Sequence, residues 1–276
     1  MKMPVLLIVD DEKPTRDALR MGFQDDYEVY TAANLSQASA LLQEESPDLV
    51  LTDLRLGGES GMDVLKAAAS LPHPPQSIMM TAYGSVDAAV AAMKEGAYDF
   101  VTKPLNLDAV ELVLKRALHT RNLETAMKAT KAAGAHAQGT LVYTISPYHK
   151  DSDYLKLAKE LVEMGADSIC IKDMSGLLAP YACASLVEAL KKEISIPVNV
   201  HSHCTSGMAS MTLLKGIEAG ADIVDTALSP FAETTSHPCT ESLVYTLKGT
   251  ERDTGIDMDK LGPIADHFKK VRADLV

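Results

Sequence analysis

Short apolar runs alternate with segments of helical periodicity along the first half of the chain. Apolar runs of this length, bounded by polar residues, are typical of buried strands. They occupy residues 5–10, 28–33, 49–54, 77–82 and 98–103. Helical patterns follow in "TRDALRMGF", "LSQASALLQEE", "GMDVLKAAASL", "SVDAAVAAMKEGA" and "LDAVELVLKRAL". Strict alternation of strand and helix predicts an α/β fold with a parallel sheet and right-handed crossovers.

The same alternation continues in the second half. Strand-like runs occupy residues 140–146, 168–174, 198–203 and 222–229. The helical patterns between and after them are "YLKLAKELVEMGA", "YACASLVEALKKE", "GMASMTLLKGIEAGA" and "MDKLGPIADHFKKVRADL". The second half is therefore also predicted to contain parallel strands joined by helices.

A change of helical phase marks the seam between the halves. The apolar stripe that begins at Leu107 reaches Leu118, but Arg121 and Asn122 occupy the next register and the stripe resumes at Leu123. Either the helix breaks near residues 119–122, or one helix turns a different face to a second body. We place the boundary here, which gives predicted domains at 1–120 and 121–276.

Composition and charge exclude several classes of protein. Apolar residues make up 46% of the 276, and the net charge is −12, which argues against nucleic-acid binding because phosphate contacts need clustered Lys and Arg. Apolar runs are too short to span a membrane, and acid follows the first residues too soon for a secretory signal. The four cysteines lack metal-site spacing and are interpreted as reduced thiols of a cytoplasmic protein.

Polar residues follow the predicted strands of the first half at the ends where ligands bind in open parallel sheets. These residues are Asp10, Asp11, Asp53, Thr81 and Lys103. Each acid alone could be a helix cap or a turn residue. Together, three carboxylates repel one another unless a hard cation such as Mg²⁺ joins them. Lys103 and Thr81 could then hold an anion beside Asp53.

Residues 1–120 contain the four motifs "LLIVDDE", "LVLTDLRLGGESGMDVL", "IMMTAYGS" and "GAYDFVTKPLN". On these motifs the region resembles the receiver domain of two-component response regulators, closest to the nitrogen-regulator class. The resemblance implies that Asp53 is the phosphoacceptor, forming an acyl phosphate. It implies that Asp10, Asp11 and Asp53 hold Mg²⁺ with the carbonyl of Arg55, and that Thr81 and Lys103 contact the phosphoryl group.

The same resemblance carries smaller expectations. Phe100 would be the switch aromatic, and the Lys103–Pro104 bond would be cis. Gly57 stands where this class usually has proline, which should loosen the loop. A histidine kinase or a small phosphodonor is the implied partner.

A second constellation lies in the other half. His201 and His203 stand two apart at the end of a strand, so both point to one face, as metal ligands would. Lys172 ends the preceding strand. A strand lysine that reaches solvent is the plain alternative.

Residues 121–275 contain the motifs "NLETAMKATKAAGAHAQGTLVYTISPYH", "MGADSICIKDMSGLLAPY", "IPVNVHSHCTSGMASMTLLKGIEAGADIVDTALSP" and "SHPCTESLVYTLKGTERDTG". On these motifs the region resembles the carboxyltransferase domain of biotin-dependent oxaloacetate decarboxylase, pyruvate carboxylase and transcarboxylase. The family fold is a (β/α)₈ barrel with its site at the carboxyl ends of the strands. The resemblance implies that a carboxylated Lys172, His201 and His203 are three of four metal ligands, and that Thr235 transfers a proton.

The fourth implied ligand is an Asp in an Arg-Asp-Ala-His-Gln-Ser type motif, which the sequence does not contain. We therefore expect a flavodoxin-like (βα)₅ receiver fused to the last four β/α units of a TIM barrel, an arrangement typical of an engineered chimera. The alternative architecture is one composite barrel-like sheet. The alternative function is an active metal-dependent carboxyltransferase or oxaloacetate decarboxylase. We expect Mg²⁺ at the receiver, Zn²⁺ or a similar ion held weakly at Lys172, His201 and His203, no biotin, and a homo-oligomer formed through the half-barrel edges.

Overall fold

The computed structural model describes residues 3–81, 91–147 and 149–275 and divides into two compact units, Met1–Ala126 and Met127–Val276. Helix α5 (Leu107–Ala132) runs without a break through both this division and the predicted boundary near residue 121. Of the two alternatives for the seam, the helix break is therefore wrong, and a single long helix connects the units.

The first unit contains a five-stranded parallel sheet in the order β2-β1-β3-β6-β7. The strands are β1 (Val5–Val9), β2 (Glu28–Ala32), β3 (Leu49–Asp53), β6 (Gln76–Thr81) and β7 (Asp99–Thr102). Apolar side chains on both faces of β1, β3 and β6 are buried, as expected for a sheet covered by helices on each side. The alternation read from the sequence is thus confirmed for this unit.

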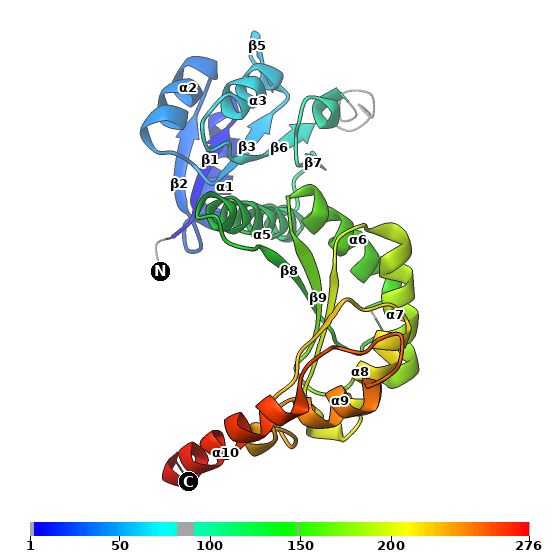
Figure 1. Cartoon of the computed structure of the whole chain (residues 1–276). Coiled ribbons are helices and arrows are strands. Elements are labelled where there is room, and N and C mark those ends of the chain that lie inside the picture. The colour runs from blue at the N-terminus through cyan, green and yellow to red at the C-terminus, as the bar shows by residue number, and fades with distance from the viewer. Residues whose placement is uncertain (1–2, 82–90, 148, 276) are drawn as a thin grey trace. The chain divides into compact units, whose positions relative to one another are not determined.

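Helices cover both faces of this sheet (Figure 1). Helix α1 (Lys13–Phe23) and α5 pack on one face, where Leu19 and Leu114 share a core with Leu6 and Ile8. Helices α2 (Leu35–Glu44) and α3 (Gly61–Ala69) pack on the other. A short hairpin, β4 (Arg55–Leu56) with β5 (Glu59–Ser60), precedes α3. The end of the predicted strand 77–82 and the start of the predicted helix 85–97 lie outside the described residues.

Polar residues continue the buried face of α5 beyond Ala117. The Arg121 guanidinium donates to Asp48 Oδ1 at 3.1 Å and also to the carbonyl oxygen of Pro74. One turn further, Glu124 accepts a hydrogen bond from Gln76. Arg121, which interrupts the apolar stripe in the sequence, therefore ties α5 to the amino-terminal end of the first sheet.

The second unit contains a four-stranded parallel sheet in the order β11-β10-β9-β8, which is simple sequence order. The strands are β8 (Gln138–Val142), β9 (Ser168–Asp173), β10 (Val198–Ser202) and β11 (Ile223–Val224). The last strand is much shorter than the predicted 222–229. Among the described residues, the strands of the two units form separate sheets.

Three helices pack on one face of this sheet: α6 (Asp151–Glu163), α7 (Pro180–Glu193) and α8 (Ala209–Glu218) (Figure 1). In the strand register Val142 lies opposite Lys172, and Lys172 opposite His201. Cross-strand neighbours leave the sheet on the same side, so these three residues share one face.

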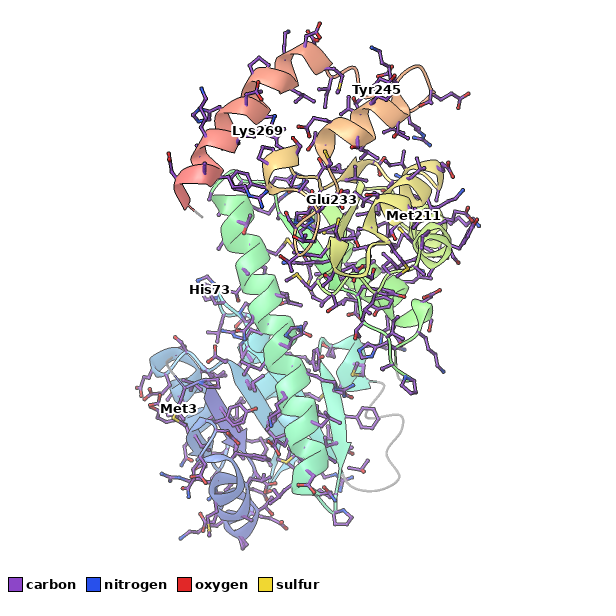
Figure 2. The ribbon with its side chains drawn as sticks, turned by 90° about the horizontal axis from the view of Figure 1, so that it is seen from below. Met3, His73, Met211, Glu233, Tyr245 and Lys269 are labelled. Atoms are coloured by element: carbon purple, nitrogen blue, oxygen red, sulfur yellow. The ribbon has the colours of Figure 1, made fainter. Side chains whose placement is uncertain are left out.

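Short helices and two longer ones complete the second unit. They are η1 (Cys204–Ser206), η2 (Ser229–Phe231), α9 (Thr240–Leu247) and α10 (Met258–Leu275). The sequence patterns did not predict α9. Met211 on α8 and Tyr245 on α9 are exposed at the surface (Figure 2). None of the described helices is long and apolar enough to cross a membrane.

Candidate functional sites

Three carboxylates meet at the carboxyl end of the first sheet. Asp10 directly follows β1, Asp53 is the last residue of β3, and Asp11 comes next to Asp10 in the chain. One oxygen of each lies within 4.8 Å of the others. Asp10 is fully buried, whereas Asp11 is exposed. The geometry therefore brings together the three acids singled out in the sequence.

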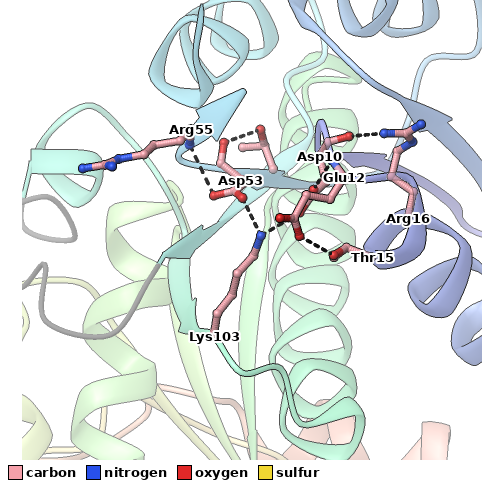
Figure 3. Close-up of polar contacts among 8 residues, drawn as sticks. Asp10, Glu12, Thr15, Arg16, Asp53, Arg55 and Lys103 are labelled. Carbon is pink, nitrogen blue, oxygen red and sulfur yellow. Dashed lines mark hydrogen bonds and ion pairs between the residues drawn. The ribbon is translucent and has the colours of Figure 1, made fainter. Parts of the chain in front are cut away.

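Lys103 joins two of these acids. Its ammonium nitrogen lies 2.5 Å from Asp53 Oδ2 and 2.9 Å from Asp10 Oδ2 (Figure 3). Lys103 follows β7 at the sheet edge, and the cis peptide bond to Pro104 expected from the resemblance is present. One cation thus neutralises part of the negative charge that the acids concentrate.

Burial and pairing act in opposite directions on the ionisable groups of this pocket. Burial raises the pKa of Asp10, and the hydrogen bond and charge of Lys103 only partly offset it. Burial by itself would lower the pKa of Lys103, but hydrogen bonds to Asp10 and Asp53 outweigh it, so that the pKa is raised. At neutral pH the pocket holds a charged lysine beside a carboxylate that is costly to ionise.

Backbone groups fix the remaining carboxylate oxygens. The amide of Arg55 donates to Asp53 Oδ1 at 3.2 Å, and the amide of Glu12 donates to Asp10 Oδ1 at 2.8 Å (Figure 3). Arg16 donates to the carbonyl oxygen of Asp10 at 2.5 Å. The orientations of Asp10 and Asp53 are therefore set by their own loops.

Thr81 and Phe100 occupy the neighbouring strands. Thr81 ends β6 and is 3% exposed, while Phe100 on β7 is 40% exposed. Thr81 is thus in the sheet layer that carries Asp53, at the same strand ends. The switch role expected of Phe100 stays a prediction.

Gly57 has a backbone φ of +69° in the turn between β4 and β5. Proline is locked near −65°, so the residue usual at this position in the resembled class could not take up this turn. That Gly57 also loosens this loop stays a prediction.

The second site is a cluster of three imidazoles. One ring nitrogen from each of His201, His203 and His237 lies within 4.8 Å of the others. The Nε2 atoms of His201 and His203 are 3.4 Å apart. His201 is the second-to-last residue of β10, and His237 lies in the loop before α9. Burial and the neighbouring His237 lower the pKa of His201, against the opposing effect of Asp225.

The other two residues predicted for this site, Lys172 and Thr235, lie beside the cluster, and Asp225, which was not predicted, contacts it. Lys172 is opposite His201 in the β9–β10 register, on the same face. Thr235 contacts the cluster through its backbone, since its carbonyl oxygen accepts from His203 Nδ1 at 2.6 Å. Asp225 Oδ2 is 2.7 Å from His201 Nδ1.

Sequence reasoning missed His237 and Asp225. Both lie in the quoted motifs, in "DIVDTALSP" and "SHPCTES", but neither shares the strand spacing that singled out the first two histidines. Asp225 follows the short β11 and could have been found as an acid at a strand end, the signal used in the first half. His237 sits in an irregular loop and carried no such signal.

Comparison with known proteins agrees with both halves of this description. Residues 6–115 match the model of the response regulator receiver domain. A pyruvate carboxylase subunit of Methanocaldococcus jannaschii is 62% identical over 152 residues, which are 55% of this chain and 27% of that protein. The methylmalonyl-CoA carboxyltransferase 5S subunit of Propionibacterium freudenreichii subsp. shermanii is 47% identical over 154 residues, 55% of this chain and 30% of that one.

A solved structure adds a likeness of fold. The carboxyl transferase domain of Rhizobium etli pyruvate carboxylase with pyruvate aligns with a TM-score of 0.54 and 25% identity, over 99% of this chain and 47% of that one. The chain spans between about a quarter and a third of the length of the two curated relatives. It is therefore a two-part composite, in which a region that matches the response regulator receiver domain is joined to a region similar to pyruvate carboxylase and transcarboxylase proteins.

Proposed function

We propose that the first unit is a phosphoacceptor domain in which Asp53 receives a phosphoryl group from a histidine kinase or a small phosphodonor. The Asp53 carboxylate would attack phosphorus, form an acyl phosphate and expel the donor's leaving group. Mg²⁺, held by Asp10, Asp11 and Asp53 with the carbonyl of Arg55, would neutralise the charge gathered there. Thr81 and Lys103 would contact the phosphoryl oxygens.

The observation that carries this proposal is the contact of Lys103 with both Asp53 and Asp10. It places a fixed positive charge beside the oxygen that would be phosphorylated. Preorganised charges of this kind stabilise developing negative charge without reorganisation. The receiver match over residues 6–115 supports the same assignment.

Intact-mass spectrometry of the full chain with acetyl phosphate and Mg²⁺ tests the proposal. We expect one phosphoadduct per chain, lost in Asp53→Asn and when Mg²⁺ is chelated. Asp25→Asn removes an exposed acid from the same unit and serves as the matched control. A folded wild-type chain that gains no adduct with Mg²⁺ present would refute the assignment.

For the second unit we propose half of a carboxyltransferase barrel without a complete active site, joined to the receiver as an engineered chimera. The sequential order of its four strands and the identity to the carboxylase relatives support its origin. Catalysis by a metal ion requires a shaped site that positions the substrate, and the Asp-containing motif implied by the resemblance is absent from the sequence.

Oxaloacetate turnover by the full chain discriminates this proposal from its alternative. We expect decarboxylation at the rate of the buffer with metal alone. The alternative, an active metal-dependent carboxyltransferase or decarboxylase, requires turnover that is proportional to protein and is removed by His201→Ala.

A further inference from the structure

Arg16 holds the backbone of the loop that carries two of the three acids of the first unit. It lies in the first turn of α1, and its Nη1 atom donates to the carbonyl oxygen of Asp10 at 2.5 Å (Figure 3). This carbonyl belongs to the peptide unit that joins Asp10 to Asp11. A peptide unit is planar and includes the Cα atom of the next residue. The bond from Arg16 therefore also constrains where the Cα atom of Asp11 lies.

The guanidinium satisfies a backbone oxygen beyond the end of a strand. Strand β1 and its ladder to both neighbouring strands end at Val9, and Asp10 is fully buried. A buried carbonyl oxygen needs a hydrogen-bond partner, and a charged donor is a strong one. Arg16 itself is half-buried, and in the described part of the chain it forms no ion pair with a carboxylate. Its charge is therefore used on the backbone of the loop.

Asp11 depends on this backbone for its position. Its side chain is exposed, so that packing does not hold it, yet one of its carboxylate oxygens lies within 4.8 Å of those of Asp10 and Asp53. The other bonds of the loop hold Asp10: its amide donates to the carbonyl oxygen of Ala32 at 3.2 Å, and its Oδ1 atom accepts from the amide of Glu12 at 2.8 Å. Arg16 adds a bond on the peptide unit between the two acids.

We propose, on the basis of the phosphoacceptor function proposed above, that Arg16 is a positioning residue for the Mg²⁺ of that site. It acts through Asp10 and Asp11, by holding their shared peptide unit so that both carboxylates face Asp53 before the ion binds. A loop that is not held in this way must be ordered when the ion binds, and such ordering lowers affinity.

Charge and geometry predict opposite effects of removing Arg16. A guanidinium repels a divalent cation nearby, so that if charge alone mattered, loss of Arg16 would tighten Mg²⁺ binding. If Arg16 positions the acids, its loss weakens binding. A residue that only stabilises α1 would leave the Mg²⁺ affinity of the folded chain unchanged. The direction of the change in affinity therefore separates the three roles.

Calorimetric titration of the full, metal-depleted chain with Mg²⁺, without a phosphodonor, tests the proposal. Arg16→Met removes the charge and the donor but keeps an unbranched apolar stem and a high helix propensity. We expect it to bind Mg²⁺ about tenfold more weakly, at the lower end of the loss that is typical when a partner of a metal ligand is removed. Arg16→Lys keeps a charged donor and should lose less than about threefold.

Arg20→Met is the matched control. It removes the same charge from an exposed position one turn further along α1, and because exposed charges are screened, the affinity should stay within about twofold of wild type. Unchanged or tighter Mg²⁺ binding by Arg16→Met would overturn the proposal. A loss as large in Arg16→Lys as in Arg16→Met would also contradict it, as would the absence of Mg²⁺ binding by the wild-type chain.

Hydrogen exchange of the metal-free wild-type chain gives a measurement that needs no variant to fold. If the loop is held before the ion binds, the amide of Glu12 should exchange at least about tenfold more slowly than in the unfolded chain. Exchange as fast as in the unfolded chain would show that the loop is not preorganised and would overturn the proposal.

Labelling by acetyl phosphate separates binding from chemistry. In Arg16→Met the Mg²⁺ concentration for half-maximal labelling should rise by the same factor as the dissociation constant, while the rate at saturating Mg²⁺ stays within about twofold of wild type. A wild-type chain that binds Mg²⁺ but gains no phosphoadduct would refute the phosphoacceptor function. In that case the calorimetric comparison of Arg16→Met with wild type would still decide the role of Arg16.

Discussion

A Cβ atom at Gly61 would lie 1.9 Å from the carbonyl oxygen of Asp53. No residue with a side chain can approach so closely without moving the backbone. Gly61 also donates its amide to the carbonyl of Leu54 at 2.9 Å, which closes the loop that begins at Asp53. The first residue of α3 therefore packs directly against the backbone of the proposed phosphoacceptor.

Gly61→Ala should consequently impair both stability and phosphorylation. Overpacking of this kind typically costs about 1–3 kcal/mol, and the displaced loop carries Asp53. We expect a lower urea midpoint and slower acetyl phosphate labelling. The matched control is Gly58→Ala, where an added Cβ meets nothing within 4 Å. Equal behaviour of the two variants would contradict the argument.

Asp10→Asn should stabilise the chain without Mg²⁺ and remove its response to Mg²⁺. Burial raises the folded pKa of Asp10 above the unfolded value. The stability contributed by the protonated Asp10 carboxyl is therefore fully present below the unfolded pKa and is lost as pH rises through the folded pKa. At neutral pH, the uncharged amide of Asp10→Asn should therefore raise the free energy of unfolding by about 0.5–2 kcal/mol.

The measurement is urea unfolding with and without Mg²⁺ at two pH values. Saturation at 100 times the dissociation constant would stabilise the wild-type unit by about 2.7 kcal/mol, and Asp10→Asn should lose most of this gain. Asp25→Asn should keep it. A variant less stable than wild type in the absence of Mg²⁺ would show that pairing with Lys103 outweighs burial.

Arg121→Ala should destabilise the first unit more than Arg116→Ala does. The Arg121 side chain is 14% exposed and bonds Asp48, whereas that of Arg116 is 56% exposed and bonds Asp99. Hydrogen bonds to charged groups contribute about 1.5–3 kcal/mol when sheltered, and exposed ion pairs about 0–1. Urea midpoints of the two variants compare them on one helix. Equal losses of stability in the two variants would mean that the bonds of Arg121 do not anchor α5 to the first sheet.

The second unit should associate with a further copy of the chain. In its described sheet β8 pairs only with β9, and Val142 on this edge strand is 60% exposed. Exposed apolar edge strands favour pairing. Light scattering over a dilution series should give a mass that falls towards the monomer, and Val142→Lys should weaken association about tenfold, or about 1.4 kcal/mol. Met21→Lys, at a 73% exposed site of α1, is the control. A monomer at every concentration would exclude self-association.

Periodicity was enough to predict the parallel sheets, because most of their strands are apolar runs and the helices between these strands have apolar stripes. It left two alternatives where the apolar stripe is interrupted at Arg121, a helix break or one helix that turns a different face. The helix continues, and the Arg121 side chain bonds Asp48 on the face that Val110 and Leu114 bury. The two-residue β11 is too short for a pattern of its own.

The acidic site followed from topology, since residues after parallel strands must meet at one sheet edge. His237 could not be placed in this way. It reaches His201 through an irregular loop with two non-glycine residues at positive φ, Glu233 and Thr234. Such a path depends on the whole fold, and no local spacing encodes it.

The buried carboxylate of Asp173 has a consequence for motion. Its bonds to the amides of Leu177 and Leu178 make this loop dependent on the strand that carries Asp173. Those two protons should exchange with solvent deuterium only when the β9–β10 ladder opens, although they belong to no helix or strand. The loop then opens only together with the sheet. The exchange rate of its two amides therefore measures how often the end of β9 and β10, beside His201, opens.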